Sequence, residues 1–107
     1  MDIYEVIEIL SKIEEENITI TNHFMERWEN RKDKLPNISK IKNMLLTQKP
    51  VGILKQSGNK FRLYYELDEK YDLIIVISVW NTNPIDINLV TTYPQEKKKR
   101  ERKDERI

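Results

Sequence analysis

The spacing of the apolar residues changes once along this chain of 107 residues, at Pro50. Before Pro50 they recur every three or four positions, as on one face of an α-helix. After it they alternate with polar residues or form short apolar runs, as in β-strands. Helices followed by strands that short turns connect are typical of an α+β domain. The sequence therefore predicts N-terminal helices packed on one face of a twisted antiparallel sheet.

The ends of the predicted elements follow from capping residues and from prolines. Thr21 or Asn22 is a good N-cap for a helix, and Pro36 and Pro50 interrupt helical segments. We expect helices over residues 2–16, 23–32 and from Asn37 or Ser39 to Thr47. We expect four antiparallel strands, over residues 51–56, 61–67, 73–80 and 85–93. The alternating segment ITIT at residues 18–21 is too short to be assigned as a strand.

The chain is long enough for one domain, which we place at residues 1–94. Residues 95–107 form a charged, basic C-terminal tail or helix that contains the run KKKRERKDER. The formal net charge of the whole chain is only +1, so global charge predicts no partner. The basic end could contact a polyanion, although mixed charge runs are more often solvated helices or tails.

Residue types also exclude several kinds of site. The chain has no cysteine and one histidine, so we expect no disulfide, no thiol nucleophile, no metal site and no cofactor. The first ten residues, MDIYEVIEIL, lack the basic segment of a secretory signal. The longest apolar run, LIIVISVW, is much shorter than the ~20 residues that span a bilayer. We therefore expect a cytoplasmic protein that does not enter membranes.

His23 is the most informative candidate for a functional residue. Arg27 and Arg31 follow it at intervals of four, so a helix would place an imidazole beside two guanidiniums. An imidazole can exchange protons near neutral pH, and arginines bind phosphate oxygens with directed hydrogen bonds. The alternative is a surface histidine beside arginines that pair with nearby carboxylates.

Two of the predicted strands carry further candidates. Lys60, Arg62 and Tyr64 share one face of the second strand, and Thr91, Thr92 and Tyr93 lie near the end of the last one. If the helix that begins at His23 lies across the sheet edge, these groups could converge on a phosphodiester. The alternative is ordinary strand composition, since Thr and Tyr favour strands and Lys and Arg favour exposed faces.

The run ITITNHFMERWENR, the later FRLYYEL and the closing LVTTYP together resemble a known family. They are similar to the small I-x-x-x-x-H-x-x-x-R-x-x-x-R domains of the barnase/EndoU/colicin/RelE-type ribonuclease superfamily, which includes toxins of toxin–antitoxin systems. The resemblance covers residues 18–94 and implies a RelE/barnase-like fold. It also implies metal-independent RNA cleavage through a 2′,3′-cyclic phosphate. The active set that it implies consists of His23, Arg27, Arg31, Arg62 and one of Thr91, Thr92 or Tyr93.

The leading prediction is thus an endoribonuclease of the toxin type, with RNA as substrate and an antitoxin or another protein as partner. We assign catalysis to the following residues: His23, Arg27, Arg62, Thr92 and Tyr93. We assign substrate binding to Arg31, Lys60 and Tyr64. Two alternatives use the same sequence features: a non-catalytic module that binds nucleic acid through these cations, and a protein-interaction domain that docks a basic partner on the acidic first helix.

Overall fold

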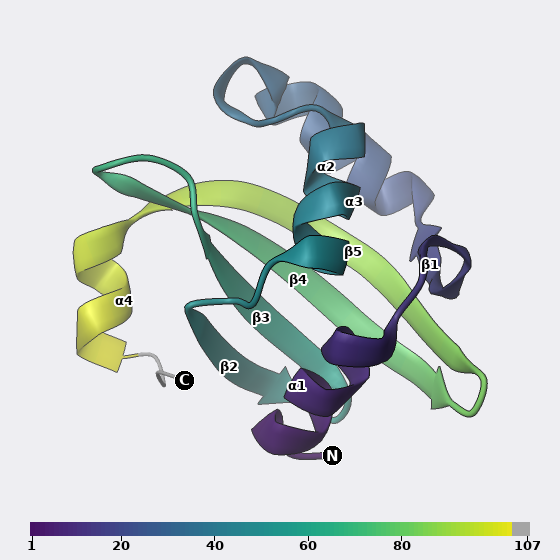
Figure 1. Ribbon diagram of the computed structural model, residues 1–107. Helices are drawn as coiled ribbons and strands as arrows, with labels where there is room; N and C mark the ends of the chain where they lie inside the picture. The colour runs from purple at the N-terminus through teal and green to yellow at the C-terminus, as the bar shows by residue number, and fades with distance from the viewer. Residues whose placement is uncertain (104–107) are drawn as a thin grey trace.

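The computed structural model of the chain describes the backbone of residues 1–103 and the side chains of residues 1–100. Within this part the protein is an α+β domain, as predicted, with helices and one sheet (Figure 1). The helices are α1 (Ile3–Lys12), α2 (Asn22–Arg31), α3 (Ile38–Thr47) and α4 (Lys97–Lys103), with short 3-10 turns at Glu15–Asn17 and Lys32–Lys34. The strands are β1 (Ile18–Ile20), β2 (Gly52–Ser57), β3 (Lys60–Glu66), β4 (Tyr71–Thr82) and β5 (Ile85–Glu96).

The sheet differs from the four antiparallel strands that we expected. Among the described residues it has five strands in the order β1-β5-β4-β3-β2. β2 to β5 form the predicted antiparallel meander, but β1 joins its edge in parallel, with Ile18 opposite Ile87 and Ile20 opposite Leu89. The segment that is too short to assign from sequence is therefore a strand, because its pairing partner lies almost 70 residues further along the chain.

The first helix is shorter than the predicted range 2–16. Asp2 begins it with a capping box, in which the Asp2 carboxylate accepts a hydrogen bond from the Glu5 amide. The helix ends at Lys12, before the acidic residues 14–16, because negative side chains are unfavourable at the C-terminal end of a helix dipole. Asn17 then accepts a hydrogen bond from the Glu14 amide and donates one to the Ile85 carbonyl, which ties this segment to β5.

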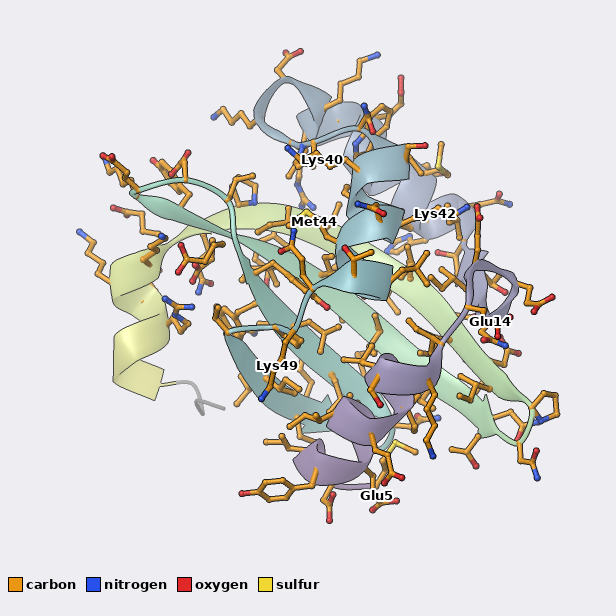
Figure 2. The ribbon with its side chains drawn as sticks, in the orientation of Figure 1. Glu5, Glu14, Lys40, Lys42, Met44 and Lys49 are labelled. Carbon is orange, nitrogen blue, oxygen red and sulfur yellow. The ribbon has the colours of Figure 1, made fainter. Side chains whose placement is uncertain are left out.

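One face of the sheet packs against α1, α2 and α3 and forms the main core. The fully buried side chains of this core include Val6, Phe24, Ile41, Leu63 and Ile75. Figure 2 shows Met44 pointing from α3 toward the sheet, whereas Lys40 points outward from the same helix. This arrangement confirms the predicted packing of the N-terminal helices on one face of the sheet.

The opposite face, which we call the second face, carries alternate residues of β3, β4 and β5. Its centre is a smaller apolar cluster that includes Tyr64, Ile74 and Val76. The helix α4 packs against one end of this face, where the Arg100 Nε lies 3.3 Å from the Asp72 carboxylate and the Lys97 Nζ lies 2.8 Å from that of Glu66. The basic C-terminal segment is thus a helix on the second face as far as residue 103.

Within residues 1–103, none of the helices is long and apolar enough to cross a membrane.

Candidate functional site

The helix α2 lies alongside β5, and both ends of the helix are attached to that strand. At the start, the Thr21 Oγ1 accepts a hydrogen bond from the Phe24 amide and donates one of 2.9 Å to the Leu89 carbonyl. Phe24 is fully buried in the core, and the Trp28 indole donates to the Pro36 carbonyl. Phe24 and Trp28 therefore anchor α2, and they fix which of its faces is turned toward the sheet.

The side chains of His23, Arg27 and Arg31 differ in exposure along α2. His23 is exposed, whereas Arg27 and Arg31 are partly buried. The cause is the helical repeat: four residues turn by about 400°, so each i+4 step rotates by about 40° around the axis. The three residues also extend over about 12 Å of helix. They form a spiral stripe in which neighbours adjoin, but His23 and Arg31 do not lie at one point.

Arg31 is docked on β5. Its Nη1 donates a hydrogen bond of 2.9 Å to the Thr92 carbonyl and one of 3.3 Å to the Thr91 Oγ1. Its guanidinium carbon lies 5.7 Å from the centre of the Tyr93 ring, at cation–π distance. The structure thus unites a predicted substrate-binding arginine with two candidates from the last strand, Thr91 and Tyr93.

Two predicted site residues are enclosed. The Thr92 side chain is 0% exposed, and its hydroxyl donates a 2.8 Å hydrogen bond to the Ile74 carbonyl. Tyr64 is also 0% exposed, and its hydroxyl accepts a 3.0 Å hydrogen bond from Arg62. Neither the predicted catalytic role of Thr92 nor the predicted substrate contact of Tyr64 fits this burial, which the alternation of strand residues alone could not reveal.

The other strand candidates lie on the second face, in rows that cross the sheet. Arg62 is opposite Val76, which is opposite Thr91, so Arg62 and the Arg31–Thr91 contact lie at the two ends of one row. Neighbouring strands are about 4.8 Å apart, so these ends are separated by about 10 Å. Lys60 is opposite Ser78 in another row, nearer the turn between β2 and β3. The predicted strand candidates therefore do not converge on a single point.

A surface pocket of about 340 Å³ opens beside Arg31. Its lining consists of Asn30, Arg31, Asp33, Lys34, Tyr93 and Pro94. Lys34 and Pro94 were not among the predicted site residues. Lys34 follows Arg31 by three positions and Pro94 follows Tyr93 directly, and this proximity to two candidates is the only sequence signal that could have suggested them.

Among the residues that the structure describes, no three His, Cys, Asp or Glu side chains gather into a group that could hold a metal ion.

Comparison with known proteins places the chain in a family. The family described as the MJ0788 family matches residues 4–77, which is more than half of the chain. The chain belongs to the MJ0788 family. A relative from Methanocaldococcus jannaschii, described as uncharacterized protein MJ0788, is 45% identical over 64 residues, which are 60% of this chain and 81% of the relative. No solved structure matches the chain significantly.

The MJ0788 family match begins within α1, includes α2 and α3 and ends within β4. It therefore spans His23, Arg27, Arg31 and Arg62, but not Thr91 or Tyr93 on β5. Neither the family's description nor the relative's name gives an activity.

Proposed function

We propose that this protein is a metal-independent endoribonuclease that uses the α2 stripe and the adjoining edge of β5. The observation that carries the proposal is the docking of Arg31 against Thr91 and Tyr93, which continues the stripe from His23 to the wall of a pocket. A proton-exchanging group, guanidiniums and an aromatic ring are thereby arranged along one path. Phosphates bind guanidiniums and unstacked bases stack on aromatic rings, so this path suits a single strand of RNA.

In the proposed reaction the cleaved phosphate lies against His23 and Arg27. Their Cβ atoms are neighbours at about 6 Å, so both can reach one phosphodiester. The ribose 2′-oxygen bonds to phosphorus and gives its proton to the imidazole, while the bond from phosphorus to the 5′-oxygen breaks and that oxygen takes up a proton from water. The products are a 2′,3′-cyclic phosphate and a 5′-hydroxyl. Arg27 stabilises the charge on the phosphorane, and one well-placed proton acceptor contributes about 10²- to 10⁴-fold.

Arg31 has a different role from Arg27 in this proposal. Because its guanidinium is held by the Thr92 carbonyl and the Tyr93 ring, it binds the neighbouring nucleotide and positions the strand. Arg62 lies about 10 Å away across the row that ends at Thr91, so it adds a long-range positive charge rather than a contact. The proposed site thus leaves out two of the predicted site residues, Thr92 and Tyr64, since both support the sheet.

The wider assignment belongs to the same proposal. Helices on one face of an antiparallel meander are compatible with a RelE/barnase-like fold. A cytoplasmic toxin with an antitoxin as its protein partner is the biological role that fits such a nuclease best.

The test is cleavage of mixed single-stranded and structured RNAs in EDTA by wild-type protein and by the His23→Ala variant. Asn22→Ala is the matched control, because Asn22 is the adjacent exposed residue of the same helical turn. We expect fragments that end in cyclic phosphate with the wild type and the control, and none with His23→Ala at unchanged circular dichroism. Equal cleavage by His23→Ala would exclude the mechanism. RNA retained without cleavage by all three proteins would favour a binding module.

A further inference from the structure

We propose that two adjoining pockets at the end of α2 bind a nucleotide next to the cleaved phosphate, so that the substrate of this site is single-stranded RNA with at least one unstacked base. This inference rests on the proposed function and names its substrate class. It is carried by the shape of the pockets, by the aromatic rings in their walls and by the charges around them.

The pockets are neighbours because they share two wall residues. The pocket beside Arg31 has a volume of about 340 Å³, and the next has a volume of about 500 Å³ and is lined by Lys34, Leu67, Asp68, Tyr71 and Pro94. Lys34 and Pro94 line both. Each volume lies within the range of small-molecule sites, about 300 to 1,000 Å³. A strand that passes Arg31 can therefore place a nucleoside in this hollow.

The walls offer two surfaces for stacking a base. Tyr93 lines the smaller pocket and Tyr71 the larger, and both rings are partly exposed. Each ring also has a cation over it at 5.7 Å, Arg31 over Tyr93 and Lys70 over Tyr71. Bases in single-stranded RNA are recognised chiefly by stacking on aromatic rings and arginine planes. A paired base within a duplex cannot present its face to either ring.

The charges around the pockets suit a phosphate with its base. Lys34 is exposed and lines both pockets, and Arg31, the last residue of the stripe that begins at His23, lines the smaller one. In the larger pocket, the Asp68 carboxylate accepts hydrogen bonds from the Lys70 and Tyr71 amides. Its oxygens are acceptors, so the pocket favours a base that presents N–H groups over one that presents only carbonyls.

The decisive experiment measures binding without cleavage. The probe is a fluorescent hexanucleotide of mixed sequence with 2′-O-methyl riboses, in which the attacking oxygen is blocked, and affinity is read by anisotropy at low salt. We expect Lys34→Ala and Tyr71→Ala each to weaken binding by roughly tenfold, since stacking on one aromatic residue and one phosphate contact have effects of this order. Lys49→Ala is the matched control, because Lys49 is an exposed lysine in the connection between α3 and β2 (Figure 2) and lines neither of these pockets.

The outcomes separate this inference from the proposed function. If Lys34→Ala and Lys49→Ala lose the same small amount of affinity, or if a duplex of the same sequence binds as tightly as the single strand, the inference is overturned even when the wild type cleaves RNA. If the wild type binds through Lys34 and Tyr71 but produces no fragments, the pockets stand and the nuclease assignment fails. Should Tyr71→Ala not fold, Lys34→Ala with the duplex comparison decides alone.

Discussion

Replacing Thr92 by valine tests whether this hydroxyl acts in chemistry, as the sequence predicts, or supports the sheet, as the structure indicates. The side chain is 0% exposed and its hydroxyl makes one hydrogen bond, to the Ile74 carbonyl at 2.8 Å. Valine keeps the branched shape and removes that bond. The backbone carbonyl of residue 92 remains, so the hydrogen bond from Arg31 to it is preserved.

The expected loss can be worked out from this geometry. One buried hydrogen bond contributes about 1 kcal/mol net, and the Ile74 carbonyl left in a dry site adds to the loss, so we expect a decrease of about 1 to 2 kcal/mol in the free energy of unfolding. For a domain of this size, 1 kcal/mol corresponds to a fall of roughly 4 to 8 °C in Tm. Urea denaturation followed by circular dichroism measures the first quantity, and a thermal scan measures the second.

Thr91→Val is the matched variant, because Thr91 is the preceding residue and is only partly buried. Its hydroxyl accepts a long hydrogen bond of 3.3 Å from Arg31, so we expect a loss of stability under about 1 kcal/mol but a several-fold drop in RNA cleavage. Thr92→Val should keep its cleavage rate per folded molecule. The reasoning would be refuted if Thr92→Val abolished cleavage at unchanged stability.

Three further predictions concern stability, pH and salt. Tyr65→Phe should raise the free energy of unfolding by up to about 1 kcal/mol in urea titrations, because the buried Tyr65 hydroxyl has no hydrogen-bond partner among the described residues. Burial also raises the pKa of Tyr65, so the phenol stays neutral in the native state. The free energy of unfolding should fall as pH rises above about 10, because Tyr65 ionises there in the unfolded chain, and the fall should be smaller in Tyr65→Phe. Backbone hydrogen bonds from Tyr71 and Lys70 lower the pKa of Asp68. The ionised Asp68 carboxylate therefore stabilises the folded protein above about pH 4, and this stabilisation is lost on acidification. Asp68→Asn should make the free energy of unfolding less dependent on pH between 5 and 3. RNA affinity should fall linearly with salt on a log–log plot, and Arg27→Ala should reduce the slope by about one; an unchanged slope would show that Arg27 contacts no phosphate.

Much of the fold could be predicted because local patterns dominate it. The period-two segments after Pro50 became β2 to β5, and the helices α2 and α3 begin within two residues of the expected positions. The missed strand β1 depends on distant contacts, because it is three residues long and is a strand only where β5 offers it a partner. The C-terminal segment, predicted as a tail or a helix, contains the helix α4, and its place on the second face depends on Asp72 and Glu66 from β4 and β3. A charged run such as residues 97–103 carries no sequence signal for such partners.

The candidate site could be predicted in part, for the same reason. The spacing of His23, Arg27 and Arg31 placed them on one stripe, but the drift of the helical repeat and the anchoring by Phe24 decide that Arg31 hydrogen-bonds to the strand. Thr92 and Tyr93 are consecutive residues, and side-chain alternation sends one inward and one toward the pocket. The register of β5 with β4 decides that Thr92 points inward and Tyr93 toward the pocket, and a bulge near Val76 shifts that register.

The docking of α2 also explains why the edge of β5 is a suitable place for a functional surface. β1 pairs with β5 only across Ile87–Leu89, so beyond it the edge of β5 would present unpaired backbone groups to other chains. Thr21 bonds the Leu89 carbonyl and Arg31 bonds that of Thr92, so α2 protects this edge with side chains instead of a strand. A side chain that caps an edge leaves its remaining donors and the neighbouring ring open to a ligand, as a paired strand would not.

Because Arg31 both caps this edge and is proposed to bind RNA, Arg31→Ala should reduce stability and RNA binding together. Arg31→Lys keeps the positive charge and loses the planar fork, so it should bind RNA more weakly than the wild type while losing less stability than Arg31→Ala. Equal losses of stability in the two variants would show that the fork itself, rather than the positive charge, secures the edge of the sheet.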